Sequence, residues 1–255
     1  MADRSPTREE LARSFDDAAA VYARARPGYP DEALDWLLPA HARDALDLGA
    51  GTGKLTARLV ARGLNVSAVE PSDRMRAELE ALLAGRVTAL AGTAEWIPLP
   101  DASQDVVLVA QAWHWVQPAR AIPEVARVLR PGGRLGLLWN CRDETVPWVA
   151  ELGRILARPG ESTDTAGAAA RSASLGPPFG PVERFETGRW TQTLTPEGLV
   201  ELAASRSYVI TLEPDRREAL LDRVRELLAR HPELSDRREI ELPYVTECIR
   251  AELAD

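Results

Sequence analysis

The sequence predicts an α/β protein with a doubly wound, mostly parallel β-sheet. Short apolar segments alternate with segments whose apolar residues recur at helical spacing, and turns containing glycine or proline separate them. The run 106–110 is continuously apolar, as expected for a central parallel strand that is buried on both faces. With 255 residues, 45% of them hydrophobic, the chain is long enough to bury one large core.

The first predicted strand, 44–48, leads directly into a glycine-rich turn and then a helix. Gly49, Gly51 and Gly53 lack a Cβ atom, so the chain can turn tightly and a ligand can approach the backbone. Residues 55–60 have helical spacing of apolar side chains, and Gly63 is a suitable residue to end that helix. A strand, a glycine turn and a helix N-terminus together predict a corner that binds a nucleotide-type ligand.

The spacing of the glycines narrows the ligand class. A dinucleotide fingerprint requires a third glycine where this chain has Lys54 or Thr56, depending on the glycine from which one counts. A phosphate-binding P-loop also requires an earlier glycine before Lys54 and a Ser or Thr directly after it. Neither pattern is present, which argues against a pyrophosphate at this corner.

A second strand, 65–69, ends at Glu70, about 20 residues beyond the glycine turn. A carboxylate at this end of a strand can accept hydrogen bonds from both hydroxyls of a ribose, so Glu70 is a candidate for binding an adenosine. Pro71 ends the strand, and Ser72 is a candidate N-cap for a helix that contains Met75.

Three further strands complete the first half of the chain. Residues 87–92 form the third and are followed by the loop 93–101, and the fourth begins at Asp105. Ligands bind outside the carboxyl ends of parallel strands, where the fourth strand presents Gln111, His114 and Trp115. A helix over 121–130, a turn at Pro131 and a fifth strand over 134–139 come next.

The second half of the chain has weaker patterns. We expect a helix over 151–158, a mobile loop over 159–178, a sixth strand over 182–194 and a seventh over 239–246. Two helices, 196–206 and 215–230, form an insertion between these last two strands. Pro243 favours an edge or a bulge in the seventh strand, because proline cannot donate a ladder hydrogen bond.

The order of these motifs resembles that of class I S-adenosylmethionine-dependent methyltransferases. The resemblance covers about residues 20–145 and depends on Asp47 with the glycine turn, on Glu70 and on the Arg-Val-Leu-Arg-Pro-Gly-Gly passage at 127–133. The segment 22–30 and the pair His114-Trp115 are similar to the type 11 subgroup, which includes small-molecule (trans-aconitate-like) methyltransferases. The resemblance implies a Rossmann-like sheet of seven strands with an antiparallel last strand and an N-terminal helical lid.

The resemblance also implies the organisation of the chain and its cofactor site. We expect residues 1–255 to form a single domain, with the lid in 1–40, the cofactor-binding core in 41–145 and the substrate-side elements in 146–255. S-adenosyl-L-methionine is the expected cofactor, with S-adenosyl-L-homocysteine as the product. The residues expected to bind it are Tyr22, Arg26, Asp47, Gly49, Ala50, Gly51, Thr52, Gly53, Glu70, Pro71, Met75, Thr93, Ala94, Glu95, Gln111 and Ala112.

The methyl acceptor is expected to be a small molecule, and a carboxylic acid is one candidate class. Tyr29, His114, Trp115 and Arg142 are the candidate substrate-binding residues, and His114 is the candidate catalytic base. A carboxylate acceptor needs no base, whereas a phenol or an amine needs one. The sequence leaves open whether oxygen, nitrogen or carbon is methylated. Arg24 and Arg206 are further candidates to pair with an acid.

Composition argues against several other classes of protein. The net charge of −8 argues against a nucleic-acid partner, and no apolar run has the length of a membrane span. The N-terminus lacks an apolar signal segment, so we expect a cytoplasmic protein that does not bind membranes. Cys141 and Cys248 are too few for a four-ligand zinc site, and no metal is expected. The oligomeric state is left open.

Two alternative functions also follow from the sequence. An NAD(P)-dependent oxidoreductase can have a similar doubly wound sheet, although the glycine spacing disfavours it. A cofactor-binding protein without catalytic activity can serve as an interaction module, although the intact Asp47, glycine turn and Glu70 argue against this alternative.

Overall fold

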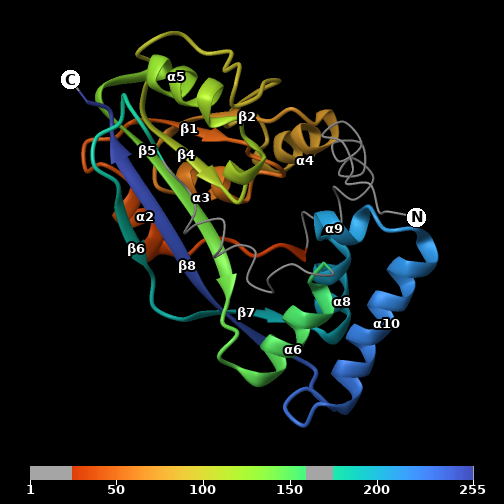
Figure 1. Ribbon diagram of the computed structural model, residues 1–255. Coiled ribbons are helices and arrows are strands. Elements are labelled where there is room, and N and C mark those ends of the chain that lie inside the picture. The colour runs from red at the N-terminus through yellow and green to blue at the C-terminus, as the bar shows by residue number, and fades with distance from the viewer. Residues whose placement is uncertain (1–24, 159–174, 255) are drawn as a thin grey trace. The chain divides into compact units, whose positions relative to one another are not determined.

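A computed structural model describes residues 25–158 and 175–254 (Figure 1). Tyr22, Arg24 and most of the predicted loop 159–178 therefore lie outside the described residues. The chain divides into two compact units, which we describe separately. The sheet unit comprises Gly28–Cys141, Ala166–Gly188 and Val245–Asp255, and the helical unit comprises Met1–Pro27, Arg142–Thr165 and Arg189–Tyr244.

The sheet unit contains the predicted doubly wound sheet. Its strands lie in the order β3-β2-β1-β4-β5-β8-β6. The β1, β2, β3, β4 and β5 strands pair in parallel, β6 pairs antiparallel with β8, and β8 runs opposite to β5 (Figure 1). The α/β class, the mostly parallel sheet and the antiparallel last strand are thus confirmed. The strands are β1 (Asp44–Leu48), β2 (Asn65–Val69), β3 (Thr88–Leu90), β4 (Gln104–Ala110), β5 (Leu129–Arg142), β6 (Glu183–Glu186) and β8 (Ile240–Glu252).

Over residues 25–158 and 175–254 the sheet already has eight strands, so the predicted number of seven is wrong. The expected sixth strand, 182–194, is two strands, β6 and β7 (Trp190–Leu194), which pair with different parts of β8. Between them the chain leaves the ladder, because the Gly188 backbone N–H donates to Oε2 of Glu32 at 3.0 Å instead of to a strand. The last strand is also longer than predicted and extends to Glu252.

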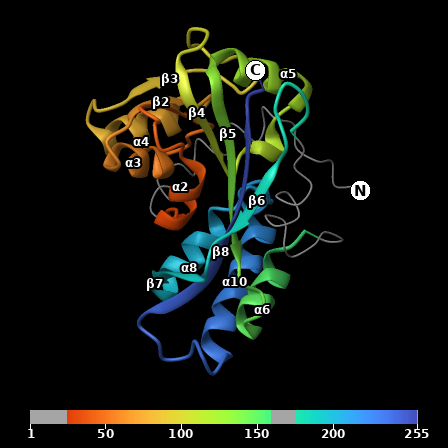
Figure 2. The ribbon, with the colours of Figure 1, turned by 90° about the vertical axis from the view of Figure 1, so that its left-hand side faces the viewer.

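Helices cover both faces of the sheet, and alternate residues of the strands face each side. On one face, Leu108 of β4 packs with α2 (Asp31–Leu37) and α3 (Lys54–Ala61). On the other face, Val107 packs with Val125 of α5 (Pro118–Val128). The α4 helix (Asp73–Leu83) buries Leu79 against Ala68 of β2. Figure 2 shows α2, α3 and α4 on the side of the strands opposite to α5.

The helical unit has its own hydrophobic core. Trp148, Leu202 and Val224, from three different helices, are buried in one cluster. The helices α8, α9 and α10 follow β7 and precede β8, so the predicted helical insertion between the last two strands is confirmed. Among the described residues no helix is both long and apolar enough to span a membrane. The helices of the unit are α6 (Pro147–Leu156), α8 (Pro196–Ala204), α9 (Ser207–Ile210) and α10 (Pro214–Arg230).

Candidate cofactor site

The glycine turn after β1 has a backbone that favours glycine. Gly49, Gly51 and Gly53 have φ angles of 74°, 55° and 84°, in the left-handed region. A Cβ atom on Gly49 would lie 2.9 Å from Cβ of Ala112, so a side chain does not fit there. At Gly51 the nearest atom would be Sδ of Met75, at 4.0 Å. Gly49 is therefore needed for packing, whereas Gly51 leaves space for a ligand to approach the backbone.

The carboxyl ends of the parallel strands β1 and β2 meet at this turn. Leu48 of β1 is in register with Val69 of β2, and the backbone N–H groups of Gly49 and Ala50 both donate to the Val69 carbonyl, at 2.8 and 3.1 Å. Glu70 follows Val69 directly, so the structure brings it next to the glycine turn, as predicted. These hydrogen bonds fix the turn to the end of the second strand.

Glu70 is a buried acid that already organises the turn. Its Oε2 accepts a hydrogen bond from the Gly51 N–H at 2.8 Å, and its Oε1 accepts one from the Ser72 N–H at 3.0 Å. Each carboxylate oxygen can accept more than one hydrogen bond, so a ribose diol can bind while these contacts are kept. Arg76, which the sequence analysis missed, donates to the carbonyls of Glu70 and Pro71 at 2.8 and 3.1 Å and holds this segment.

Asp47 is completely buried beneath the turn. Its Oδ2 accepts a hydrogen bond from the Thr56 hydroxyl at 2.6 Å, whereas its Oδ1 and the buried hydroxyl oxygen of Thr52 have no partner among the described residues. Burial raises the pKa of Asp47 to about 7, and the charge of Glu70 adds to this rise. Buried oxygens that lack a hydrogen-bond donor could accept a hydrogen bond from a cationic group of a ligand, such as the ammonium group of methionine.

The loop after β3 forms a tight turn that presents two predicted residues. Thr93 and Trp96 exchange backbone hydrogen bonds of 3.1 and 3.2 Å, which places Ala94 and Glu95 at the tip between them. Oε1 of Glu95 accepts a hydrogen bond from the backbone N–H of Gln117 at 2.8 Å. Ala94 is buried and Trp96 is exposed. Hydrogen bonds within the protein thus hold Glu95, the residue expected to face the adenine, in place.

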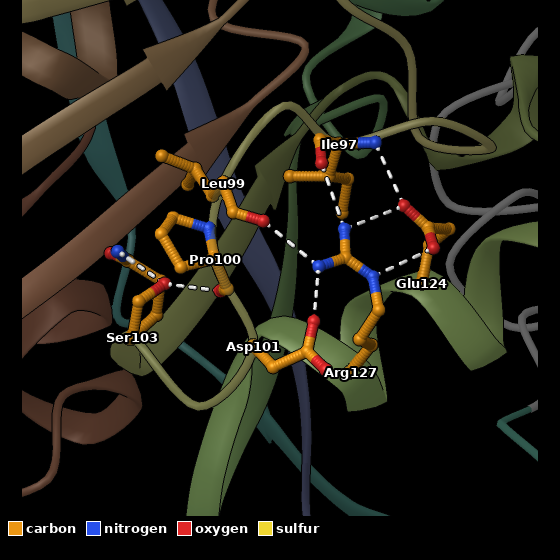
Figure 3. Close-up of polar contacts among 8 residues, drawn as sticks. Ile97, Leu99, Pro100, Asp101, Ser103, Glu124 and Arg127 are labelled. Carbon is orange, nitrogen blue, oxygen red and sulfur yellow. Dashed lines mark hydrogen bonds and ion pairs between the residues drawn. The ribbon is translucent and has the colours of Figure 1, made fainter.

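Arg127 fixes the remainder of that loop to α5 (Figure 3). Its guanidinium donates to the carbonyls of Ile97 and Leu99, both at 2.8 Å, and to Oδ1 of Asp101 at 2.7 Å. It also pairs with both carboxylate oxygens of Glu124 at 2.9 Å, and Glu124 accepts the Ile97 N–H. The sequence motif at 127–133 identified the family resemblance but did not reveal this bridging role.

The segment after β4 contains Gln111, His114 and Trp115. Gln111 has a positive φ of 59°, uncommon for a residue with a side chain, and donates to the Asn140 carbonyl at 3.4 Å. The rings of His114 and Trp115 lie 4.7 Å apart on the short turn η1 (Trp113–Trp115). Desolvation by the surrounding protein lowers the pKa of His114 to about 4, although the residue as a whole is exposed to solvent. The imidazole is therefore neutral at pH 7 and is a weak base.

Tyr29 belongs to the sheet unit, in the segment before α2. Asn140 fixes this segment, because its Nδ2 donates to the Gly28 carbonyl at 2.9 Å while its Oδ1 accepts from the Thr246 hydroxyl at 2.8 Å. Sequence patterns did not point to Asn140, since it lies within a strand and appears there as an ordinary strand residue.

Arg26, Arg142 and Arg206 belong to the helical unit, unlike the other predicted site residues that the structure describes. Nη2 of Arg26 donates to the Ser205 carbonyl at 3.0 Å. The Arg142 side chain is 10% exposed and its Nη2 lies 3.6 Å from Oε1 of Glu144. The structure thus places Arg26 and Arg142 among the residues around α6 and α8, and the predicted roles of all three arginines stay predictions.

Comparison with known proteins consistently identifies methyltransferases. Residues 46–137 match the family model described as a methyltransferase domain. An uncharacterized methyltransferase of Mycobacterium tuberculosis is 57% identical over 97% of this chain and 99% of its own length. A methyltransferase-like protein of Schizosaccharomyces pombe is 34% identical over 94% and 95% of the two chains.

Solved structures share the fold. A putative type II methyltransferase from Anaeromyxobacter dehalogenans has a TM-score of 0.63 and 28% identity, over 90% of this chain and 98% of its own. A phosphoethanolamine N-methyltransferase of Haemonchus contortus, solved with S-adenosylhomocysteine, has a TM-score of 0.56 over 98% and 61% of the two chains. At 15% identity, the second likeness concerns the fold alone.

Proposed function

The chain belongs to the type 11 family of class I S-adenosylmethionine-dependent methyltransferases, and we propose that it methylates a small-molecule carboxylic acid on oxygen. S-adenosylmethionine is its methyl donor. We assign Asp47, the glycine turn and Glu70 to the donor: Glu70 for the ribose, Asp47 for the ammonium group and the tip at Glu95 for the adenine. The alternative of an NAD(P)-dependent oxidoreductase has no support from the family.

The burial and hydrogen bonding of Arg142 are the observation that supports a carboxylic acid as the acceptor. Its side chain is 10% exposed, it has Glu144 as an ion-pair partner at 3.6 Å, and its Nε has no acceptor among the described residues. A buried guanidinium with an unfilled N–H donor is unfavourable unless a hydrogen-bond acceptor completes it. Carboxylates match the planar fork of arginine and are the anions best suited to this position.

The properties of His114 agree with an acid rather than with a phenol or an amine. With a pKa of about 4, the imidazole is a weak acceptor for a proton from a phenol or an ammonium group. A carboxylate is already ionised at pH 7 and needs no base. Under this proposal His114 is not a catalytic base, and its role is at most to contact the acceptor.

When bound, S-adenosylmethionine supplies a methyl group activated by its sulfonium, and transfer to a carboxylate oxygen breaks the carbon–sulfur bond, leaves the electron pair on sulfur and moves no proton. The protein contributes alignment and exclusion of water, since both reactants are already in their reactive forms. Its residues therefore act by binding and orienting rather than by covalent chemistry.

Transfer of tritium from methyl-labelled S-adenosylmethionine to a panel of small acids, phenols and amines tests the proposal. We expect label only with acids, and we expect alkali to release it as volatile methanol, because methyl esters hydrolyse under conditions that leave methyl amines and ethers intact. Label that stays in the product after alkali would contradict methylation on a carboxylate. No transfer to any member of the panel would favour the non-catalytic alternative.

A further inference from the structure

Arg76 links three consecutive parts of the chain beside the glycine turn. Its Nη1 donates to the carbonyl of Glu70, directly after β2, at 2.8 Å and to the carbonyl of Pro71 at 3.1 Å. Its Nη2 forms an ion pair with Asp73, the first residue of α4. One guanidinium therefore holds the end of the strand, the turn that follows and the start of the helix in a single arrangement.

The turn between β2 and α4 sets the direction of the Glu70 carboxylate. Oε1 of Glu70 accepts from the Ser72 N–H at 3.0 Å, and the Ser72 hydroxyl accepts from the Met75 N–H at 3.2 Å. The backbone N–H of Glu70 donates to the Leu90 carbonyl of β3 at 3.1 Å. The backbone of Glu70 is thus fixed at its N–H by the sheet and at its carbonyl by Arg76.

Arg76 differs from an ordinary surface arginine of a helix. Its side chain is 16% exposed, whereas that of its ion-pair partner Asp73 is 89% exposed. Partial burial of a guanidinium costs desolvation, which hydrogen bonds to the two carbonyls offset. An ion pair with a largely exposed carboxylate contributes little, so the pair with Asp73 does not account for the position of Arg76. The contacts that account for it are those to the backbone of Glu70 and Pro71.

We propose that Arg76 is a positioning residue for the methyl donor, because it holds Glu70 in the orientation in which the carboxylate meets both hydroxyls of the ribose. The inference rests on the proposed function, which assigns Glu70 to the ribose. Hydrogen bonds weaken steeply as their angles depart from linear, so two bonds to neighbouring hydroxyls require a carboxylate with one fixed direction. Arg76 acts through Glu70 and not by contact with the reactants.

Calorimetric titration of the full-length protein tests this role, with S-adenosylhomocysteine and its two deoxy analogues, each lacking one ribose hydroxyl, as probes. Arg76→Met removes the guanidinium and keeps an apolar stem in its place. It should raise the Kd for S-adenosylhomocysteine about tenfold, as expected for the loss of one charge-assisted hydrogen bond. In the wild type each deoxy analogue should bind about tenfold more weakly than S-adenosylhomocysteine, and in Arg76→Met this ratio should fall to about threefold or less.

Arg74→Met is the matched control, because Arg74 is exposed on the same helix and the change in net charge is the same. It should leave both the Kd and the ratio within about twofold of the wild type. Arg76→Lys, which keeps the charge without the planar fork, should lie between the wild type and Arg76→Met. The ratio compares ligands within one protein, so it does not depend on the fraction of molecules that are folded. An effect of Arg76→Met no larger than that of Arg74→Met, or an undiminished ratio, would overturn the role of Arg76.

The double variant Glu70→Ala/Arg76→Met shows whether Arg76 acts through Glu70. Once the carboxylate is gone, Arg76→Met should change the Kd by less than about twofold. Equal effects of Arg76→Met with and without the carboxylate would overturn the inference.

The outcomes separate this inference from the proposed function. Unchanged affinity in Glu70→Ala would overturn the assignment of Glu70 to the ribose, and the inference with it. Weaker binding in Glu70→Ala but not in Arg76→Met would overturn the role of Arg76 alone and leave the assignment of Glu70 in place.

Discussion

The glycine turn of the sheet unit and the three arginines Arg26, Arg142 and Arg206 of the helical unit are assembled in opposite ways. In the turn, Gly49, Gly51 and Gly53 adopt left-handed backbone angles that the absence of a side chain permits. The end of the neighbouring parallel strand adds Glu70, which accepts a hydrogen bond from the Gly51 N–H. The three arginines come from distant segments of the chain, and only tertiary packing brings them near one another. An arrangement of the first kind is visible in a sequence motif, whereas one of the second kind is visible only in a structure.

Asp47→Asn should change the unfolding free energy more than the other substitutions do. It tests whether burial beneath the glycine turn raises the pKa of Asp47. The pKa of Asp47 is about 7 in the folded protein, above its usual value of 3.8, so between about pH 4 and pH 7 the folded state holds a proton that the unfolded chain releases. The wild type therefore loses stability relative to the variant as pH rises through that range, by about 2–4 kcal/mol.

Urea unfolding of both proteins at several pH values from 4.5 to 8 measures this difference. The difference in unfolding free energy should grow in favour of Asn up to about pH 7 and then stay constant. Parallel profiles for the two proteins would contradict a raised pKa for Asp47.

Arg127→Ala should have the next largest effect, and it tests whether the loop beside the predicted adenine position depends on one side chain. The variant loses the hydrogen bonds to Ile97, Leu99, Asp101 and Glu124, and we expect the unfolding free energy to fall by about 2–3 kcal/mol. Arg127→Lys should recover less than half, because an ammonium group has no planar fork.

Arg120→Ala is the control for Arg127, because Arg120 is exposed on the same helix. Its unfolding free energy should change by less than about 0.5 kcal/mol. A loss for Arg127→Ala no greater than that for Arg120→Ala would show that the hydrogen bonds in Figure 3 do not stabilise the loop.

His114→Ala should have the smallest effect. An imidazole with a pKa of about 4 is a weak base, and a carboxylate acceptor needs none, so kcat for an acid should stay within about twofold of the wild type from pH 6 to 9. Steady-state assays over that range measure it. A fall of tenfold or more that varies with pH would restore His114 as the catalytic base and would argue for an acceptor that must lose a proton.

Most of the sheet could be predicted from the sequence, because its signals are local. Apolar runs, helical spacing and the left-handed glycines of the turn depend on neighbouring residues, and they gave the α/β class and the insertion before the last strand. The division of 182–194 into two strands was missed, because it depends on a hydrogen bond between Gly188 and Glu32.

The site could be predicted in part for the same reason. Glu70 lies beside the glycine turn as the strand order requires, although its role toward ribose stays a prediction. Arg76, Arg127 and Asn140 were missed as supports, because each acts on residues brought near by folding. No spacing rule places the Tyr244 hydroxyl beside three arginines.

Titration of S-adenosylhomocysteine into Glu70→Ala and Arg142→Gln, side by side with the wild type, tests most directly whether the turn of the sheet unit binds the methyl donor. Glu70→Ala should weaken binding by about 1–3 kcal/mol, through loss of charge-assisted hydrogen bonds to ribose and to the Gly51 N–H. Arg142→Gln should bind within twofold of the wild type. Unchanged affinity in Glu70→Ala would contradict the assignment of the donor to this turn.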